Sequence, residues 1–218
     1  MTDARPAFTL KDLHGEAHQF DGTGPSLICF VKEDCETCNI AAPVLQALTQ
    51  AYGDKVVVLV PAQSGKANAD FVQRHGLTMP VLDDVGCKTS FDWGFEIVPA
   101  VYWIDDSGTV ATHFEGFVRD DWKALSDQIA QDTGQPVAHI DWDSLPAWRP
   151  GCGSKHFDPE VYDKLRAAAD GDVLLARKVE VASGDDVSEF MFDQGFSDGL
   201  PLVPPTPERV MRMLAGTH

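Results

Sequence analysis

The chain has 218 residues, of which 44% are hydrophobic and 23% charged, enough for one good core plus an appendage and unlike a disordered protein. Seventeen Lys and Arg against 34 Asp and Glu give a net charge of −17. This charge repels nucleic-acid phosphates and anionic lipids, so we expect neither as a partner. Residues 1–6 lack a basic stretch followed by an apolar run, and no segment approaches about 18 uninterrupted apolar residues, so we expect a cytoplasmic protein.

Strands and helices alternate in the predicted elements of the first 131 residues. In chain order we expect a hairpin at 8–20, a buried strand at 27–31, a helix at 39–52, a central strand at 56–60, a short helix at 68–75, a strand at 78–83, a brief helix at 87–93, a hairpin at 98–115 and a closing helix at 120–131. Pro80 cannot donate to a ladder, so the strand that contains it belongs at an edge. The alternation predicts a layered α/β fold.

Cys35 and Cys38 are separated by two residues at the point where a predicted strand passes into a helix. Unpaired N–H groups and the positive dipole end of that helix stabilise a thiolate, so Cys35 can act as a nucleophile and Cys38 can close a disulfide with it. A zinc site would need two more ligands, which no second CxxC supplies, and the seven histidines show no HxxxH or HxH spacing. We therefore predict a redox centre with no metal and no cofactor.

Residues 6–131 resemble the thioredoxin superfamily, and the opening Ala7–Gly15 is similar to its TlpA-like and peroxiredoxin-like branch. The resemblance implies a thioredoxin-like fold. It also assigns roles to individual residues: Cys35 and Cys38 as nucleophilic and resolving cysteines, Pro43 at the kink of the active-site helix, Pro99 as the cis-proline, and Val98 as the residue whose backbone pairs with an extended substrate.

The sequence also departs from that family. Glu33, Asp34 and Glu36 surround the nucleophile, and we expect them to raise its pKa and to favour a reductant over a strong oxidant. The alternative is that these acids are solvated and have little effect. Cys29 stands six residues before the nucleophile, where the family often has a buried Asp or Asn, so a candidate proton acceptor for Cys38 is lost.

The second half of the chain has a different composition. We predict a thioredoxin-like domain at 1–133, a Pro/Gly/Trp-rich connector at 134–157, and a helical extension at 158–218 that packs on the domain or on a partner. We expect one helix from Asp158 to about Ala169 and two shorter helices at 187–194 and 207–215. Their apolar side chains need burial, and we expect residues 134–218 to restrict access to the CxxC. Residues 195–210 also resemble bacterial proteins of the UGSC type, a selenoprotein-like family.

The three remaining cysteines receive different predictions. Cys152 lies between two glycines and is either a third redox thiol that reaches the Cys35–Cys38 centre or an unreactive loop cysteine. Cys29 and Cys87 lie in apolar segments, so we expect both to be buried packing residues.

Three functions are compatible with these patterns. The first is a thiol–disulfide oxidoreductase that reduces a protein or small-molecule disulfide and receives electrons from an upstream reductase. The second is a thiol peroxidase, although the Pro-xxx-Thr-xx-Cys spacing is missing before Cys35. The third is a thioredoxin-like accessory subunit of a larger redox enzyme that binds a protein partner, or a second copy, through residues 187–214.

Overall fold

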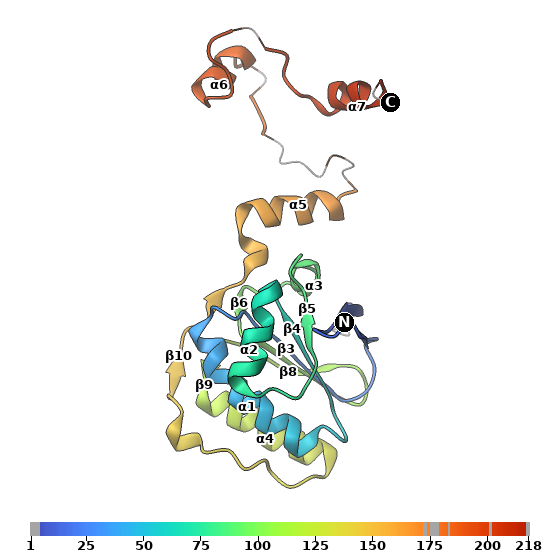
Figure 1. Ribbon diagram of the computed structural model, residues 1–218, viewed down its shortest axis with the longest axis vertical. Coiled ribbons are helices and arrows are strands. Elements are labelled where there is room, and N and C mark those ends of the chain that lie inside the picture. The colour runs from blue at the N-terminus through green and yellow to red at the C-terminus, as the bar shows by residue number, and fades with distance from the viewer. Residues whose placement is uncertain (1–4, 172–173, 175–178, 183, 201, 217–218) are drawn as a thin grey trace. The chain divides into compact units, whose positions relative to one another are not determined.

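The computed structural model describes residues 5–171, 174, 179–182, 184–200 and 202–216 (Figure 1). The expected cytoplasmic location rests partly on residues 1–4, which lie outside the described residues. Several positions of the extension predicted at 158–218 also lie outside them. The chain divides into two compact units, Met1–Leu165 and Arg166–His218.

A five-stranded sheet is the centre of the first unit, with strand order β5-β4-β3-β7-β8. Its strands are β3 (Ser26–Phe30), β4 (Val57–Ala62), β5 (Val81–Asp83), β7 (Ala100–Ile104) and β8 (Val110–Glu115). β3 runs parallel to β4 and antiparallel to β7, so that Ile28 pairs with Leu59 on one side and with Tyr102 on the other. The placement of β5 at the edge confirms the prediction from Pro80.

The helices of the first unit fall close to their predicted ranges. They are α1 (Glu36–Tyr52), α2 (Asn68–His75), α3 (Lys88–Trp93) and α4 (Arg119–Thr133), with a 3-10 turn at Gly65–Ala67. α1 contacts both α2 and α4. The N-terminal hairpin, β1 (Phe8–Lys11) and β2 (Ala17–Phe20), pairs in antiparallel register as predicted.

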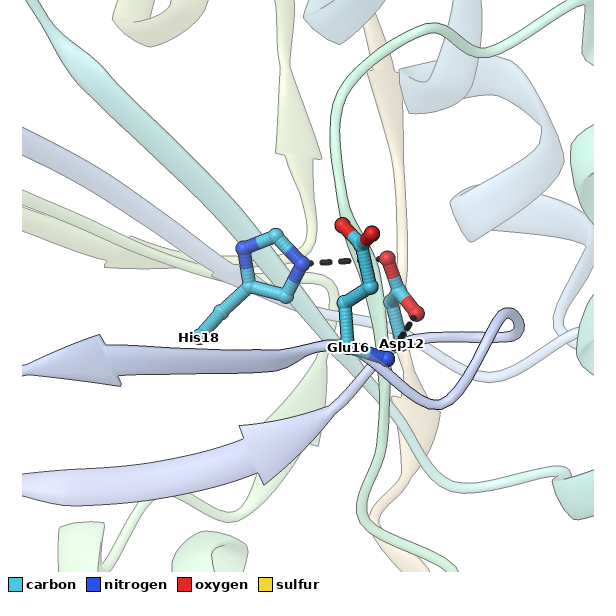
Figure 2. Close-up of side chains that lie close together, drawn as sticks. All are labelled: Asp12, Glu16 and His18. Atoms are coloured by element: carbon cyan, nitrogen blue, oxygen red, sulfur yellow. Dashed lines mark hydrogen bonds and ion pairs between the residues drawn. The ribbon is translucent and has the colours of Figure 1, made fainter.

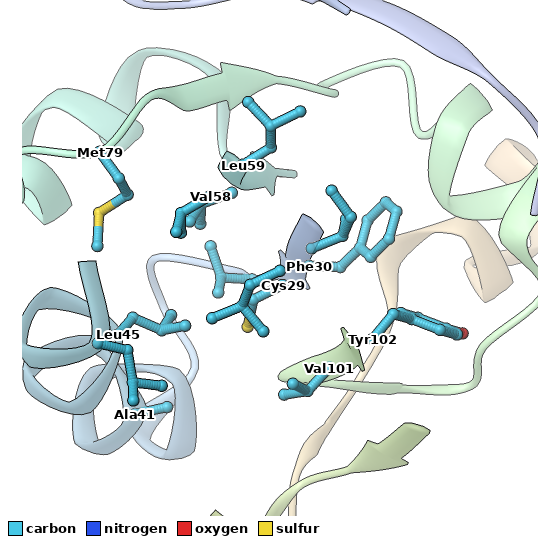
Figure 3. Close-up of a cluster of buried hydrophobic side chains, with 14 of the residues drawn as sticks. Cys29, Phe30, Ala41, Leu45, Val58, Leu59, Met79, Val101 and Tyr102 are labelled. Carbon is cyan, nitrogen blue, oxygen red and sulfur yellow. The ribbon is translucent and has the colours of Figure 1, made fainter. Parts of the chain in front are cut away.

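Apolar side chains from the sheet and from α1 form one continuous core (Figure 3). All five residues of β3 and all five of β7 are buried, as expected for strands covered on both faces. Cys29 is fully buried within this cluster. β3 ends directly before the CxxC segment, so this rigid core fixes the position from which the two thiols project.

The connector lies along the first unit. β10 (Trp148–Arg149) pairs with β9 (Phe117–Val118), and β11 (Cys152–Gly153) pairs with β6 (Ile97–Val98), each in antiparallel register. Two 3-10 turns, at Trp142–Ser144 and Lys155–Phe157, bracket these pairings. Although the backbone of the connector is fixed, the side chain of Trp148 is 59% exposed and does not join the core.

The boundary between the units falls within α5 (Pro159–Ala169). The second unit contains α6 (Val187–Asp193) and α7 (Pro207–Ala215), near the predicted ranges. Several apolar side chains of this unit are exposed, since Phe192, Phe196, Leu200 and Met213 are each more than half exposed. Their packing on the domain or on a partner stays a prediction. Among the described residues, no helix combines the length and the apolar character needed to cross a membrane.

Candidate active site

Cys35 caps the N-terminus of α1. Its backbone is extended (φ −89°, ψ 113°), and its Sγ accepts a hydrogen bond from the backbone N–H of Cys38 at 3.3 Å. Both side chains are free thiols and both residues are 0% exposed. The two-residue spacing therefore brings the sulfurs together at a helix N-terminus, as the sequence predicts, but beneath the molecular surface.

The Cys35 thiolate is stabilised mainly by other thiols. A hydrogen bond from the Cys38 side chain is the largest cause that lowers the pKa of Cys35, and hydrogen bonds from the Cys152 side chain and from the backbone N–H groups of Cys38 and Thr37 lower it further. Burial opposes them, and the pKa falls from 9.0 to about 6. The predicted rise in this pKa is therefore wrong.

The neighbouring acids have little effect because they are compensated or solvated. Glu33 Oε1 lies 2.6 Å from an Arg74 guanidinium nitrogen, Asp34 lies 3.9 Å from Lys32 Nζ, and Glu36 is exposed. Charges that are paired or surrounded by water act weakly on a buried sulfur. The alternative expectation of solvated acids fits this arrangement.

Cys38 stays protonated beneath the nucleophile. Its Sγ accepts a hydrogen bond from the backbone N–H of Lys32 at 3.4 Å, but burial is the first cause that raises the pKa of Cys38 well above 9.0. Burial likewise raises the pKa of Cys29. Cys87, whose Sγ lies 3.7 Å from Val85 O, is 1% exposed and its pKa is raised to about 12 by burial. The predicted burial of Cys29 and Cys87 is confirmed.

Val98 and Pro99 form the opposite wall of the site. The peptide bond between them is cis, as the resemblance implied. The Cys35 thiol donates to the Val98 carbonyl at 3.5 Å, and Cys152 is the antiparallel strand partner of Val98. Thr37 Oγ1 also donates to the carbonyl of Pro150. The connector therefore occupies the backbone edge that the resemblance assigns to a substrate. Pro43 lies inside α1, and its side chain is exposed.

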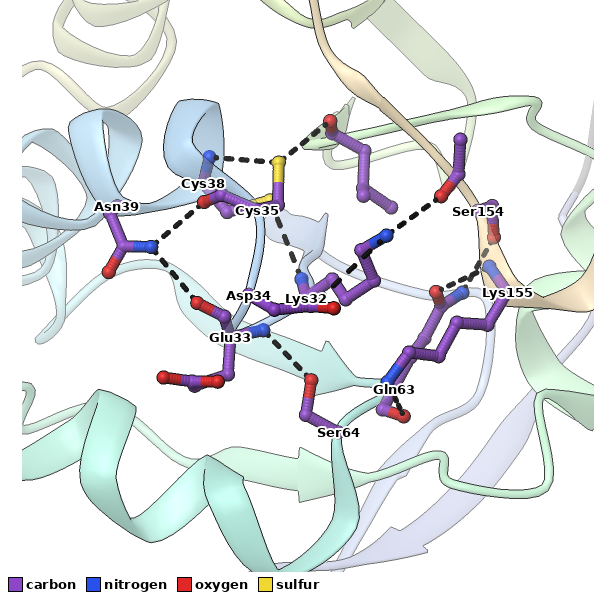
Figure 4. Close-up of polar contacts among 12 residues, drawn as sticks. Lys32, Glu33, Asp34, Cys35, Cys38, Asn39, Gln63, Ser64, Ser154 and Lys155 are labelled. Atoms are coloured by element: carbon purple, nitrogen blue, oxygen red, sulfur yellow. Dashed lines mark hydrogen bonds and ion pairs between the residues drawn. The ribbon is translucent and has the colours of Figure 1, made fainter.

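A polar frame, which sequence reasoning missed, holds the loop before Cys35 (Figure 4). Asn39 Nδ2 donates to the carbonyls of Glu33 (3.0 Å) and Cys35 (2.9 Å), and Ser64 Oγ accepts from the backbone N–H of Glu33 at 2.9 Å. The sequence did offer one signal for this contact: Asn39 stands four residues after Cys35, which is one helical turn away.

Gln63 anchors the connector to the end of β4. Its Nε2 donates to Ser90 Oγ and to Ser154 Oγ, both at 2.7 Å, and its Oε1 accepts from the backbone N–H of Lys155 at 3.0 Å. Ser154 Oγ also lies 2.7 Å from Nδ1 of the buried His156. Buried polar groups satisfied in this way fix one arrangement, so the connector is held next to Cys35. No local pattern in the sequence indicates this network.

A second polar cluster lies in the β1–β2 turn (Figure 2). Asp12 Oδ1 accepts the backbone N–H groups of His14 (2.8 Å) and Glu16 (3.0 Å), and its Oδ2 lies 3.0 Å from His18 Nε2. Asp12, Glu16 and His18 could present three ligand atoms within 4.8 Å of one another. The hydrogen bonds of Asp12 are those of a closed hairpin turn, so we assign the cluster to the turn.

Residues 1–113 match the family model described as AhpC/TSA family. The chain belongs to this family. Over 113 residues it is 29% identical to the thioredoxin-like protein YneN of Bacillus subtilis, a match that spans 48% of this chain and 65% of that relative. The family match ends before the connector begins, so Cys152 lies beyond it.

Solved structures support the same fold. A protein assigned as thiol:disulfide interchange protein DsbE from Chlorobium tepidum superposes with a TM-score of 0.56 at 24% identity, over 61% of this chain and 97% of that one. A protein assigned as a thioredoxin from Neisseria meningitidis gives 0.53 at 26% identity, over 60% and 89%. The fold of this AhpC/TSA family member is thioredoxin-like, with a mainly helical region beyond it.

Proposed function

We propose that this AhpC/TSA family member is a thiol–disulfide oxidoreductase in which Cys35 is the nucleophile and Cys38 the resolving thiol. The observation that carries the proposal is the placement of two free thiols at the N-terminus of α1, where Cys35 Sγ accepts the backbone N–H of Cys38 at 3.3 Å. In this position the pKa of Cys35 is lowered to about 6, whereas that of Cys38 is raised. At neutral pH, Cys35 is a thiolate that can attack a disulfide. Cys38 keeps a proton until that attack has taken place.

The substrate is a disulfide, either of a protein or of a small molecule. Cys35 attacks one sulfur of this disulfide, and the other sulfur leaves as a thiolate. Cys38 then loses its proton and attacks Cys35 Sγ, which forms the Cys35–Cys38 bond and releases the remaining substrate sulfur, protonated as a thiol. Thiolate stabilisation favours the reduced form of the protein and makes it a weaker reductant, so the expectation of a reductant loses the raised pKa on which it rested. Each reduction of substrate takes two electrons from the Cys35–Cys38 pair, so turnover requires an upstream dithiol that reduces the pair again.

Turnover of insulin disulfides with a reductant in excess tests the proposal. Cys35→Ser should abolish catalysis, and Cys38→Ser should turn over more slowly than the parent, with Cys35 held in a disulfide. Cys87→Ser is the matched control, because Cys87 is a buried thiol whose contact is to Val85 O, and this variant should turn over at the parent rate. Reduction by Cys35→Ser at the parent rate would refute the proposal. Rapid peroxide consumption with a sulfenate at Cys35 would instead indicate a thiol peroxidase.

A further inference from the structure

The connector covers the CxxC pair and places a third thiol beside it. Cys35 and Cys38 are 0% exposed, whereas Cys152 is partly exposed. Cys152 pairs with Val98, whose carbonyl oxygen lies 3.5 Å from Cys35 Sγ. The connector is held on both sides of Cys152. Thr37 Oγ1 donates to the carbonyl of Pro150 on one side, and Lys32 Nζ donates to the carbonyl of Gly153 at 3.2 Å on the other.

We propose that Cys152 is a third catalytic thiol, through which the covered Cys35–Cys38 pair exchanges disulfides with an external protein dithiol. This inference rests on the proposed function of Cys35 and Cys38. A disulfide between two fully buried sulfurs offers no sulfur to a macromolecular thiolate, because an attacking thiolate must reach the sulfur to which it bonds. Transfer of the disulfide to Cys152 moves one of its sulfurs to the partly exposed position.

The first step is an exchange within the oxidised protein. The Cys152 thiolate attacks Cys35 Sγ, a Cys35–Cys152 bond forms, and the Cys35–Cys38 bond breaks. Cys38 leaves as a thiolate and takes up the proton that Cys152 lost, so no net oxidation occurs. Cys152 is the strand partner of Val98, whose carbonyl oxygen lies 3.5 Å from Cys35 Sγ, so the exchange takes place between neighbouring segments of the first unit.

The second step brings in the external dithiol. One of its thiolates attacks Cys152 Sγ and expels Cys35, a good leaving group because its pKa is about 6. Its second thiol, deprotonated, attacks its own sulfur in the mixed disulfide and releases Cys152. The dithiol ends as a disulfide, having given two electrons to the Cys35–Cys38 pair.

Two glycines that flank Cys152 provide a matched pair of variants. A Cβ on Gly151 would lie 2.0 Å from Ile97 Cγ2 and 2.6 Å from Val98 O, whereas a Cβ on Gly153 meets nothing within 4 Å. Gly151→Ala should therefore push the connector away from β6 and uncover Cys35 without removing a thiol. Gly153→Ala should leave the connector in place.

The first measurement identifies the partner of Cys35. Full-length Cys38→Ser protein is oxidised with diamide, free thiols are alkylated, and peptides are mapped by mass spectrometry without reduction. We expect a Cys35–Cys152 cross-link as the main product. Cys35 bound to another partner, with Cys152 alkylated, would overturn the inference.

The second measurement follows reduction of the oxidised full-length protein by thioredoxin. Cys152→Ser should react at least about tenfold more slowly, since the covered disulfide has lost its route to the surface. Adding Gly151→Ala to that variant should restore the rate, whereas adding Gly153→Ala should not. An unchanged rate in Cys152→Ser, or a loss that Gly151→Ala does not restore, would overturn the inference. If Cys35→Ser is inactive while Cys152→Ser is fully active, only this inference fails and the proposed function stands.

Discussion

The stability of the reduced protein should depend on pH through Cys35. Its pKa is 9.0 in an unperturbed thiol and about 6 in the folded protein. Between these values the unfolded chain holds a proton that the folded chain has released, so folding becomes more favourable as pH rises. The sign follows from a depressed pKa: the contribution is complete above pH 9 and is lost as pH falls toward 6.

The expected magnitude is about 1.4 kcal/mol per pH unit, or roughly 2 kcal/mol between pH 6.5 and 8. Urea denaturation of the reduced protein at both pH values, in parallel with Cys35→Ser, isolates this contribution because the other titrating groups are shared. The free energy of unfolding of the parent should rise by about 2 kcal/mol relative to the variant. Absorbance of the thiolate at 240 nm gives the midpoint directly. Equal pH slopes in the two proteins, or a midpoint near 9, would refute the account of Cys35.

Two other predictions concern stability. Gln63→Ala removes the buried amide that ties the connector to the end of β4. Urea denaturation should show a loss of about 2 kcal/mol, and Cys35 should alkylate faster. Gln46→Ala is the control, because the partly exposed Gln46 amide bonds Thr78 and not the connector, and this variant should leave Cys35 protected. Protection that survives Gln63→Ala would show that this network does not hold the connector. Gly108→Ala places a Cβ 2.3 Å from Gly22 O at a φ of +78°, whereas Gly134 has φ +64° and open space around it. Thermal melting should therefore show a larger loss for Gly108→Ala than for Gly134→Ala, by roughly 1–3 kcal/mol, and equal losses would contradict the steric argument.

The sequence alone was sufficient for the local structure of the site. The spacing of Cys35 and Cys38 at a strand–helix junction predicted the helix cap, because caps and amphipathic periods depend on residues a few positions apart. Val98-Pro99 before a hairpin predicted the cis peptide bond through the family resemblance. The apolar run of β3 predicted the buried strand that carries the site.

The tertiary structure alone decided the electrostatics and the cover of the site. The acids near Cys35 in sequence predicted a higher pKa, but the Cys38 side chain lowers it most and the side chain of Cys152, far along the chain, lowers it further. Gln63 likewise joins the end of β4 to a connector residue 91 positions further along the chain. A pKa depends on the nearest dipoles and charges in space, and burial depends on which segments pack together, so neither can be read from local order in the sequence.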